Sequence, residues 1–339
     1  MKNHIQNKII KKIKKSNKIV ITSHVSADGD AVGSELALYE VLVSLGKDVC
    51  VVNSCEVQDC YKFLKFSSDV IVVSDAIDKK TEKVSQTQEI LLNYLQNSDL
   101  LITLDSPVEN RVDCFSEYLD KANFIINIDH HVSNQNYADI NNVNENASSV
   151  GEMLFELFSE MKIKITPSIA EALFVSISTD TGCFCYANTG SRTLTIASEL
   201  EKYIDIEKIT NNVYSAKSIE SYKLLSKALD SLVFNKKTGV AYMAITKQMF
   251  EDTNTSLLDS HDFIDYIRAI NGVKVALIFK QSPEKNSEIK VSLRSTCEFD
   301  VNKFANKYKG GGHAKASGFT VHGNLEELVI NVMKEIENG

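Results

Sequence analysis

The sequence predicts an α/β protein of two domains: a parallel sheet with helices on both faces, a helical linker, and a smaller mixed α/β domain. The chain has 339 residues, which at roughly 150 residues per domain suggests two cores. Between Lys18 and Thr179 short apolar runs alternate with helical patterns, and hairpin-like strand pairs appear nearer the C-terminus. We therefore expect a first domain over residues 1–189, a linker over 190–231 and a second domain over 232–339.

The composition is that of a globular protein, with 43% hydrophobic and 24% charged residues, 3 Pro and 14 Gly. No apolar run reaches the ~18 residues that a membrane span needs, and the N-terminus does not have the pattern of a signal peptide. We therefore expect a cytoplasmic protein without membrane contact. The 7 Cys residues are irregularly spaced and form no CxxC pair, so neither a disulfide framework nor a structural zinc site is predicted.

The net charge of −8, from 37 basic and 45 acidic residues, opposes a general affinity for long nucleic acid. That affinity comes from neutralising many phosphates with Lys and Arg. A small anionic substrate remains compatible with this charge. Residues 302–318 run against the trend, since they contain four Lys and no acid.

Five apolar runs predict the strands of the parallel sheet, at residues 18–22, 48–52, 69–73, 99–104 and 123–128. The stretches between them predict helices that cover the sheet. In such sheets ligands bind beyond the carboxyl ends of the strands. Polar residues that can bind metals follow three of these runs directly, so we expect the functional site at that edge.

The second domain follows a charged linker that has no strand pattern and is predicted to be helical. Beyond it we expect four strands, a helix before the second of them, a Gly-rich turn before the last, and a terminal helix. The strands are predicted at 239–246, 273–279, 289–295 and 318–323, and the first helix at 259–270.

A histidine and two aspartates follow the first predicted strand, because His24, Asp28 and Asp30 lie within seven residues. Gly29 is expected to let the chain turn tightly between the aspartates, and Asp30 is expected at the N-cap of the next helix, where the helix dipole favours a carboxylate. A plain helix cap is one alternative. A calcium-binding loop is another, but Val32 stands where such a loop needs an oxygen ligand.

Further acidic and imidazole groups end other elements: Asp105 ends one strand, Asp129, His130 and His131 end another, and Asp180 ends an apolar helix. Each alone could be a turn-forming residue or a buried polar residue whose hydrogen bonds are satisfied within the core. Together they favour a metal site, and carboxylates with imidazoles and no thiolate suit manganese or a similar divalent ion. The number of candidates indicates two ions, whose charges four aspartates would balance. The candidate ligands are His24, Asp28, Asp30, Asp105, His130 and Asp180.

This combination resembles the DHH phosphoesterase superfamily, and a run near the C-terminus is similar to the GGGH motif of its DHHA1 subgroup. That run is Gly310, Gly311, Gly312 and His313. The motifs occur in order along nearly the whole chain, whose length most resembles the stand-alone bacterial oligoribonuclease and pAp phosphatase members. One departure is Ala27, where the family commonly has Pro, which affects the rigidity of the loop.

The resemblance implies two ligand groups that share Asp105: His24, Asp28 and Asp105 for one manganese ion, and Asp30, Asp105, His130 and Asp180 for the other. It also implies that His131 faces the scissile phosphate or the leaving group. Asp129 would orient the neighbouring imidazole, which physically selects its tautomer.

The Gly run is the candidate substrate site of the second domain. Consecutive glycines permit backbone N–H groups to converge on an anion, and Arg294, on the strand before, could bind a phosphate with two hydrogen bonds. A flexible hairpin turn is the alternative. The predicted substrate-binding residues are Arg294, Ser295, Gly310, Gly311, Gly312 and His313.

These observations predict a two-metal phosphodiesterase and phosphatase, dependent on manganese. The resemblance implies that it hydrolyses short oligoribonucleotides to mononucleotides and dephosphorylates pAp, both by in-line displacement. A cyclic-di-AMP or pApA phosphodiesterase is the alternative enzyme, and a non-catalytic nucleotide sensor is the alternative of another class. Aromatic residues make up 8% with no Trp, which disfavours a nuclease for long single strands. A homodimer is a candidate assembly.

Overall fold

The computed structural model describes residues 2–25, 27–73, 89, 92–93, 95–112, 118–215, 217–285 and 287–338. The chain divides into two compact units, Met1–Ala216 and Lys217–Gly339. One of the seven cysteines, Cys114, lies outside the described residues. The division into 1–189, 190–231 and 232–339 stays a prediction.

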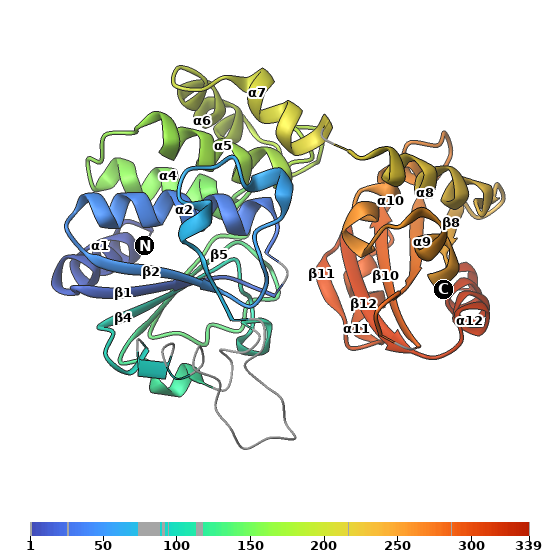
Figure 1. The fold of residues 1–339 in the computed structure, drawn as a ribbon, viewed down its shortest axis with the longest axis horizontal. Helices are drawn as coiled ribbons and strands as arrows, with labels where there is room; N and C mark the ends of the chain where they lie inside the picture. The colour runs from blue at the N-terminus through green and yellow to red at the C-terminus, as the bar shows by residue number, and fades with distance from the viewer. Residues whose placement is uncertain are drawn as a thin grey trace. The chain divides into compact units, whose positions relative to one another are not determined.

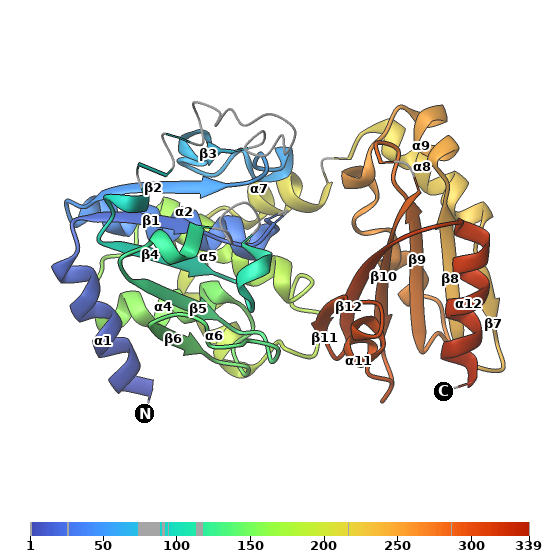
Figure 2. The same ribbon diagram turned by 90° about the horizontal axis from the view of Figure 1, so that it is seen from below.

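The first unit contains a sheet of six parallel strands in the order β3-β2-β1-β4-β5-β6, which Figure 2 shows side by side. Five of them lie on the five predicted apolar runs, although β3 is only two residues long. The strand that the sequence analysis missed is β6, whose INNV sequence has no apolar alternation. The strands are β1 (Lys18–Thr22), β2 (Asp48–Asn53), β3 (Ile71–Val72), β4 (Leu100–Leu104), β5 (Ile125–Asp129) and β6 (Ile140–Val143).

Both faces of this sheet are buried, which explains why its strands are continuous apolar runs. In β1, Ile19 and Ile21 join one core, whereas Val20 joins the core on the opposite face. The first core contains residues of α1, α2, α4 and α5, and Figure 1 shows α2, α4 and α5 on one side of the sheet. The bounds are α1 (Lys2–Lys15), α2 (Gly29–Ser44), α4 (Val150–Glu160) and α5 (Pro167–Asp180).

The predicted linker is helical, as expected. The elements are α6 (Ser191–Glu201), α7 (Ile206–Thr210), a π-helical turn (Asn211–Ser215) and α8 (Ile219–Asp230). The unit boundary falls between the π-helical turn and α8, so α6 and α7 belong to the first unit and α8 to the second. Short 3-10 helices of the first unit are η1 (Asp59–Tyr61), η2 (Ser67–Asp69) and η3 (Glu109–Arg111).

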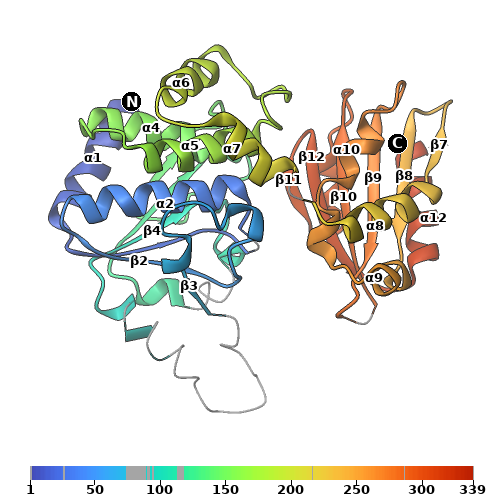
Figure 3. The ribbon, with the colours of Figure 1, turned by 45° about the horizontal axis from the view of Figure 1, so that its top comes forward.

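The second unit contains a mixed sheet in the order β11-β12-β10-β9-β8-β7, in which only the β8–β9 pair is parallel. Figure 3 shows α8 and α10 on one side of this sheet and α12 on the other. The strands are β7 (Val233–Asn235), β8 (Val240–Ile245), β9 (Val275–Gln281), β10 (Glu288–Ser295), β11 (Gly311–His313) and β12 (Ala316–His322). The helices are α9 (Lys247–Thr253), η6 (Leu257–Ser260), α10 (Phe263–Arg268), α11 (Val301–Asn306) and α12 (Leu325–Asn338).

Two predictions for the second unit need correction, and three of its elements were missed. The helix expected over 259–270 is divided into the 3-10 helix η6 and the short α10. The Gly-rich segment expected as a turn forms the edge strand β11, which pairs with β12. β7, α9 and α11 were not predicted, because each is at most seven residues long and carries too few periods of a pattern. None of the described helices is long and apolar enough to cross a membrane.

Candidate metal centre

The predicted ligands gather at the carboxyl edge of the first sheet. His24 lies two residues beyond β1, Asp105 directly follows β4, and His130 directly follows β5. These three strands are neighbours, and the chain order reverses between β1 and β4, which is where open parallel sheets bind ligands. The start of α2 and the end of α5 contribute Asp30 and Asp180 to the same place. The tertiary structure therefore brings together groups that are up to 156 residues apart in sequence, the interval between His24 and Asp180.

One ligand group consists of His24, Asp28 and Asp105, whose ligand atoms lie within 4.8 Å of one another. His24 Nε2 is 3.3 Å from Asp105 Oδ2 and 3.9 Å from Asp28 Oδ1. The other ring nitrogen, Nδ1, lies 2.7 Å from the carbonyl oxygen of Val25. A proton on Nδ1 that bonds to this carbonyl leaves the Nε2 lone pair directed at the carboxylates, as a metal ligand requires.

The start of α2 corrects two details of the sequence analysis. The N-cap is Asp28, not Asp30, because Asp28 Oδ1 accepts from the backbone N–H groups of Asp30 and Ala31 at 3.0 and 3.2 Å. Gly29 is already helical, and its role is close packing: a Cβ atom there would lie 2.5 Å from the Thr179 side chain on α5. Gly29 thus allows the start of α2 to meet the end of α5, which carries Asp180.

The second ligand group is centred on His130 Nε2. This atom lies 3.5 Å from Asp105 Oδ1, 3.5 Å from Asp180 Oδ2 and 3.7 Å from Asp30 Oδ2. His130 Nδ1 lies 3.2 Å from the carbonyl oxygen of Ala147, so its ring is oriented in the same way as that of His24. One imidazole nitrogen therefore faces three carboxylates that come from three different elements.

Asp30 is held by groups that the sequence analysis did not assign. Its Oδ2 accepts from the N–H of Val150 at 2.8 Å, and its Oδ1 accepts from the N–H of Gly151 at 3.3 Å, both at the N-terminus of α4. Oδ1 also accepts from the hydroxyls of Ser176 at 2.5 Å and Ser34 at 3.1 Å. A helix N-terminus and two hydroxyls stabilise a buried carboxylate.

Asp105 is common to both groups. Its backbone is left-handed, with φ of 53°, which directs the side chain away from the strand between the two histidines. Its Oδ1 is buried and accepts no hydrogen bond among the described residues. A buried carboxylate oxygen without a donor is costly. A cation would satisfy it, and the whole set of carboxylate oxygens and imidazole nitrogens fits a divalent metal ion.

The electrostatics of the centre agree with this. Burial and the nearby Asp105 carboxylate raise the pKa of Asp30 well above its usual range, and burial raises the pKa of Asp180 to about 6. Burial lowers the pKa values of His24 and His130, but their carboxylate neighbours raise both well above the usual value. The site thus has an excess of negative charge that draws in protons, and divalent cations would replace them.

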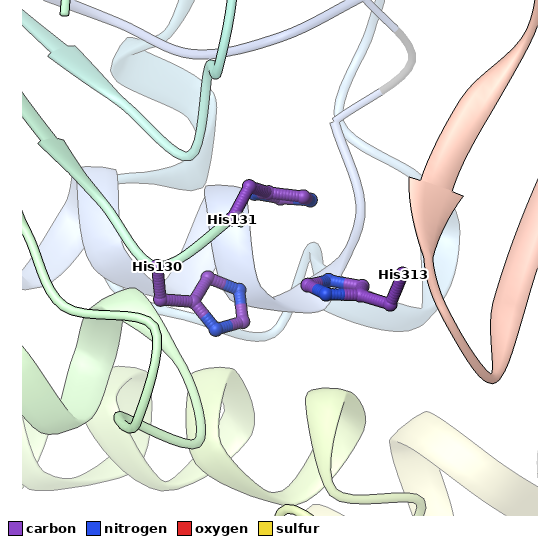
Figure 4. A group of neighbouring side chains, drawn as sticks. All are labelled: His130, His131 and His313. Atoms are coloured by element: carbon purple, nitrogen blue, oxygen red, sulfur yellow. The ribbon is translucent and has the colours of Figure 1, made fainter. Parts of the chain in front are cut away.

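His131 lies beside this centre and is paired with Asp129. Its Nδ1 lies 2.8 Å from Asp129 Oδ1 and 3.3 Å from Asp105 Oδ1. The rings of His130 and His131 extend in different directions, as Figure 4 shows. Their centroids are 5.0 Å apart and their planes lie at 66° to each other. The structure therefore brings Asp129 into contact with the imidazole that the sequence analysis expected it to orient.

Sequence reasoning missed the groups that hold Asp129. Asn134 Nδ2 donates to Asp129 Oδ2 at 2.6 Å and to Asn127 Oδ1 at 2.8 Å. Asn127 Nδ2 in turn lies 3.0 Å from Thr103 Oγ1 and 3.1 Å from the Tyr137 hydroxyl. Asn134 follows His131 by only three residues, but an isolated Asn after a strand is ordinarily a turn former. No pattern in the sequence indicated this network.

The predicted substrate residues of the second unit occupy both faces of its sheet. Arg294 projects to one face of the sheet, the same face as the residue with which it pairs on the neighbouring strand β9. Its Nε is buried and has no hydrogen-bond partner among the described residues. Ser295, one residue along the strand, belongs to the opposite face, where it is buried and its hydroxyl donates to the carbonyl of Cys297 at 3.0 Å. The structure therefore does not bring Ser295 together with Arg294.

Two glycines of the GGGH run, Gly310 and Gly312, serve close packing. A Cβ atom at Gly310 would lie 2.2 Å from the carbonyl oxygen of Gly318, and Gly312 has φ of 142° with Ala316 O at 2.5 Å from such an atom. The Gly310 N–H donates to the carbonyl of Ala305, so it does not converge on an anion. Gly311 and His313 pair with β12.

Comparison with known proteins agrees with this arrangement. Residues 18–177 match the DHH family, N-terminal domain, and residues 235–338 match the DHHA1 domain. This chain belongs to the DHH family. The DHH match contains every candidate metal ligand except Asp180, which lies three residues beyond its end, and the DHHA1 match contains Arg294 and the GGGH run.

The relatives of this DHH-family protein include proteins that align with it over nearly the full length of both chains. The bifunctional oligoribonuclease and PAP phosphatase NrnA of Thermus thermophilus is 29% identical over 320 residues, covering 94% of this chain and 89% of that protein. The crystal structure of an exopolyphosphatase-related protein from Bacteroides fragilis has a TM-score of 0.88 at 29% identity, covering 99% of this chain and 96% of that one. RecJ in complex with Mn²⁺ from Thermus thermophilus shares the fold, with a TM-score of 0.56 at 12% identity, covering 99% of this chain and 54% of that one.

Proposed function

We propose that this DHH-family protein is a metal-dependent phosphoesterase that hydrolyses short oligoribonucleotides to mononucleotides and removes the 3′-phosphate of PAP. The observation that carries the proposal is the pair of ligand groups joined by Asp105. The substrates follow the activities for which the Thermus thermophilus relative, similar over nearly its whole length, is named. Phosphoester hydrolysis is a reaction that two-metal carboxylate sites perform.

We assign His24, Asp28 and Asp105 to one ion and Asp30, Asp105, His130 and Asp180 to the other. Both groups contain hard oxygen donors and imidazole, so manganese is the ion we propose. When bound, such ions supply positive charge at the phosphate and lower the pKa of water. The protein supplies the orientation: backbone carbonyls hold the two histidine rings, and the N-terminus of α4 holds Asp30.

We assign the contact with the scissile phosphate or the leaving group to His131. The Asp129 carboxylate holds its Nδ1 at 2.8 Å, which places a proton there and leaves Nε2 to carry out this contact. Asn134 fixes Asp129 in turn through its 2.6 Å hydrogen bond. This chain orients His131 in the way that a carboxylate orients a catalytic imidazole in many hydrolases.

A substrate panel tests the proposal. Purified protein loaded with Mn²⁺ is offered pApA, PAP, cyclic-di-AMP and pyrophosphate, and we expect turnover of pApA and PAP. Preferred turnover of cyclic-di-AMP would replace the substrate assignment. Tight PAP binding without any turnover at saturating Mn²⁺ would make the protein a nucleotide sensor and refute the enzymatic proposal.

Long single-stranded RNA provides a second test. Because the net charge is −8, we expect no retention of a 50-nucleotide probe at physiological salt, measured by fluorescence anisotropy. Micromolar retention would favour a nucleic-acid-binding protein.

A cytoplasmic location and a homodimer stay predictions.

A further inference from the structure

Helix α8 of the second unit is apolar on two of its sides. On one side Leu224 and Ala228 are buried in a core of the second unit. On another side Ile219 is 63% exposed, Tyr222 51% and Leu229 41%. A helix that packs on a single side ordinarily carries polar residues elsewhere. The core of the second unit therefore does not explain the three exposed apolar side chains.

The exposed side chains follow the spacing of a helix–helix seam. Ile219, Tyr222, Ser226 and Leu229 are separated by three, four and three residues, and all four are exposed. We call these four residues the α8 stripe. Side chains at this spacing line the contact between two helices that pack along their length. Val233 on the edge strand β7, four residues after Leu229, is exposed as well.

Two opposite charges lie beside the α8 stripe. Lys223 follows Tyr222 and Asp230 follows Leu229, and both are exposed. Because they are seven residues apart, they lie on the same side of the helix, two turns from each other. Neither forms an ion pair with a residue that the structure describes. Asp230 is the last residue of α8, where the helix dipole opposes a carboxylate, so the helix itself does not favour an acid there.

These charges match each other across a two-fold axis. When two copies of one helix pack antiparallel, the charged row beside the seam of one copy meets the same row of the other in reverse order. Lys223 then lies opposite Asp230 of the second copy, and Asp230 lies opposite the lysine. Ser226 is close to the axis, where its small side chain permits the helices to approach closely. A parallel pair would place Lys223 beside the uncharged Ser218 instead.

We propose that the α8 stripe is an interface at which a second copy of this chain binds, antiparallel and two-fold symmetric, with Lys223 paired with Asp230 across it. The occupant is a second copy because one helix carries the apolar seam and both members of the charged pair, which makes the surface complementary to itself. At 1.5 Å per residue α8 is only about 18 Å long, so the interface is small and we expect a micromolar Kd. The proposal rests on the second unit alone and not on the proposed function.

The oligomeric state of the full chain tests the interface. In sedimentation velocity between about 1 and 100 µM we expect a monomer that converts to a dimer as the concentration rises. Leu229→Asp places a charge on the seam and should keep the protein monomeric. Ile330→Asp is the matched control, since Ile330 is exposed on α12 of the same unit, and it should leave the dimer unaltered. A monomer throughout, or a dimer that Leu229→Asp does not affect, would overturn the proposal.

Charge reversal tests the antiparallel pairing. Lys223→Glu and Asp230→Lys should each weaken dimerisation about 10-fold or more, because like charges then meet across the axis. The double variant should regain the original Kd within about 3-fold, because it restores opposite charges. Effects confined to one chain would add in the double variant, since the two residues lie about 10 Å apart along the helix and do not pair within it. Additive losses would therefore refute the pairing.

A folding measurement separates association from the stability of the chain. At about 1 µM, where we expect the monomer, Asp230→Lys should be at least as stable to urea as the unaltered protein, because a cation suits the end of a helix. The same variant should still dimerise more weakly at high concentration. Lower stability of the monomer would assign Asp230 to the fold and overturn its role in the interface.

Discussion

At the scale of single residues, Asp105 joins the two halves of the metal centre. Its two oxygens face different histidines, with Oδ2 toward His24 and Oδ1 toward His130 and His131. The left-handed backbone that produces this direction is uncommon for most residues, but Asp and Asn tolerate it. Replacement by Asn therefore removes the charge without straining the chain.

We expect Asp105→Asn to lower kcat for pApA and PAP by more than about 100-fold, because even groups behind the ligands cost 10- to 100-fold in metal sites. Bound Mn²⁺ per chain, measured by mass spectrometry of the digested protein, should fall at the same time. Asp120→Asn is the control, since Asp120 is exposed and forms an ion pair with Lys121. Full metal content in the Asp105 variant would contradict the shared role.

Asn134 acts on the centre through Asp129. Asn134→Ala removes the 2.6 Å hydrogen bond to Asp129 Oδ2, so the carboxylate no longer has a fixed position beside His131. We expect kcat to fall about 10- to 100-fold with little change in metal content. Nitrogen NMR of the His131 ring should show a mixture of tautomers in place of one.

The control for this variant is Asn146→Ala, an exposed Asn farther along the chain. A fall in kcat of the same size in both variants, or an unaltered His131 spectrum in Asn134→Ala, would show that Asn134 does not orient the histidine.

At the scale of elements, α2 carries functional groups on its buried sides as well as at its start. Glu35 on α2 is fully buried, and its Oε2 accepts from Asn53 Nδ2 on β2 at 2.9 Å. Its Oε1 has no hydrogen-bond partner among the described residues. Burial raises the pKa of Glu35 to about 7, although the hydrogen bond from Asn53 opposes this.

The raised pKa of Glu35 predicts a pH dependence of stability. A carboxyl whose pKa is higher in the folded state than in the unfolded state destabilises the fold as the pH rises. The loss of stability accumulates between the unfolded-state pKa of 4.5 and the folded-state pKa of about 7, and it stays constant above that pH. Across this interval the free energy of unfolding falls by about 3 kcal/mol. Urea unfolding of metal-free protein should show that Glu35→Gln is more stable relative to the unaltered protein at pH 8 than at pH 5. A difference that is constant with pH would contradict a buried, protonated Glu35.

At the scale of the whole molecule, the two units have separate cores, and the candidate ligands all belong to the first. Metal binding should therefore stabilise the first unit by mass action and leave the second unchanged. Hydrogen exchange of the full chain, followed by mass spectrometry, should show Mn²⁺-dependent protection in peptides from residues 18–180. Peptides from 240–338 should exchange at the same rate with Mn²⁺ and with a chelator.

Comparable Mn²⁺-dependent protection in both units would show that the ion also binds ligands of the second unit. Protection in neither unit would show that the centre does not hold the ion.

The sequence by itself determined the parallel sheet and the position of the centre at its edge. Runs such as 18–22 and 99–104 are apolar on both faces, which only a sheet covered on both sides permits, and the residues that follow them carry the charge. It also indicated the ligand set, because these carboxylates and imidazoles directly follow apolar strands and do not stand among other polar surface residues. Family resemblance supplied the grouping around Asp105.

Only the tertiary structure decided what supports those residues. Asn134 on Asp129 and Ser176 on Asp30 depend on distances between side chains that are remote in sequence or unremarkable in type. The face of the sheet on which Ser295 lies was likewise decided there, because a shift of one residue along a strand reverses the direction of a side chain. Local patterns record which residues are buried, whereas hydrogen-bond partners and unpaired charges are properties of the packed molecule.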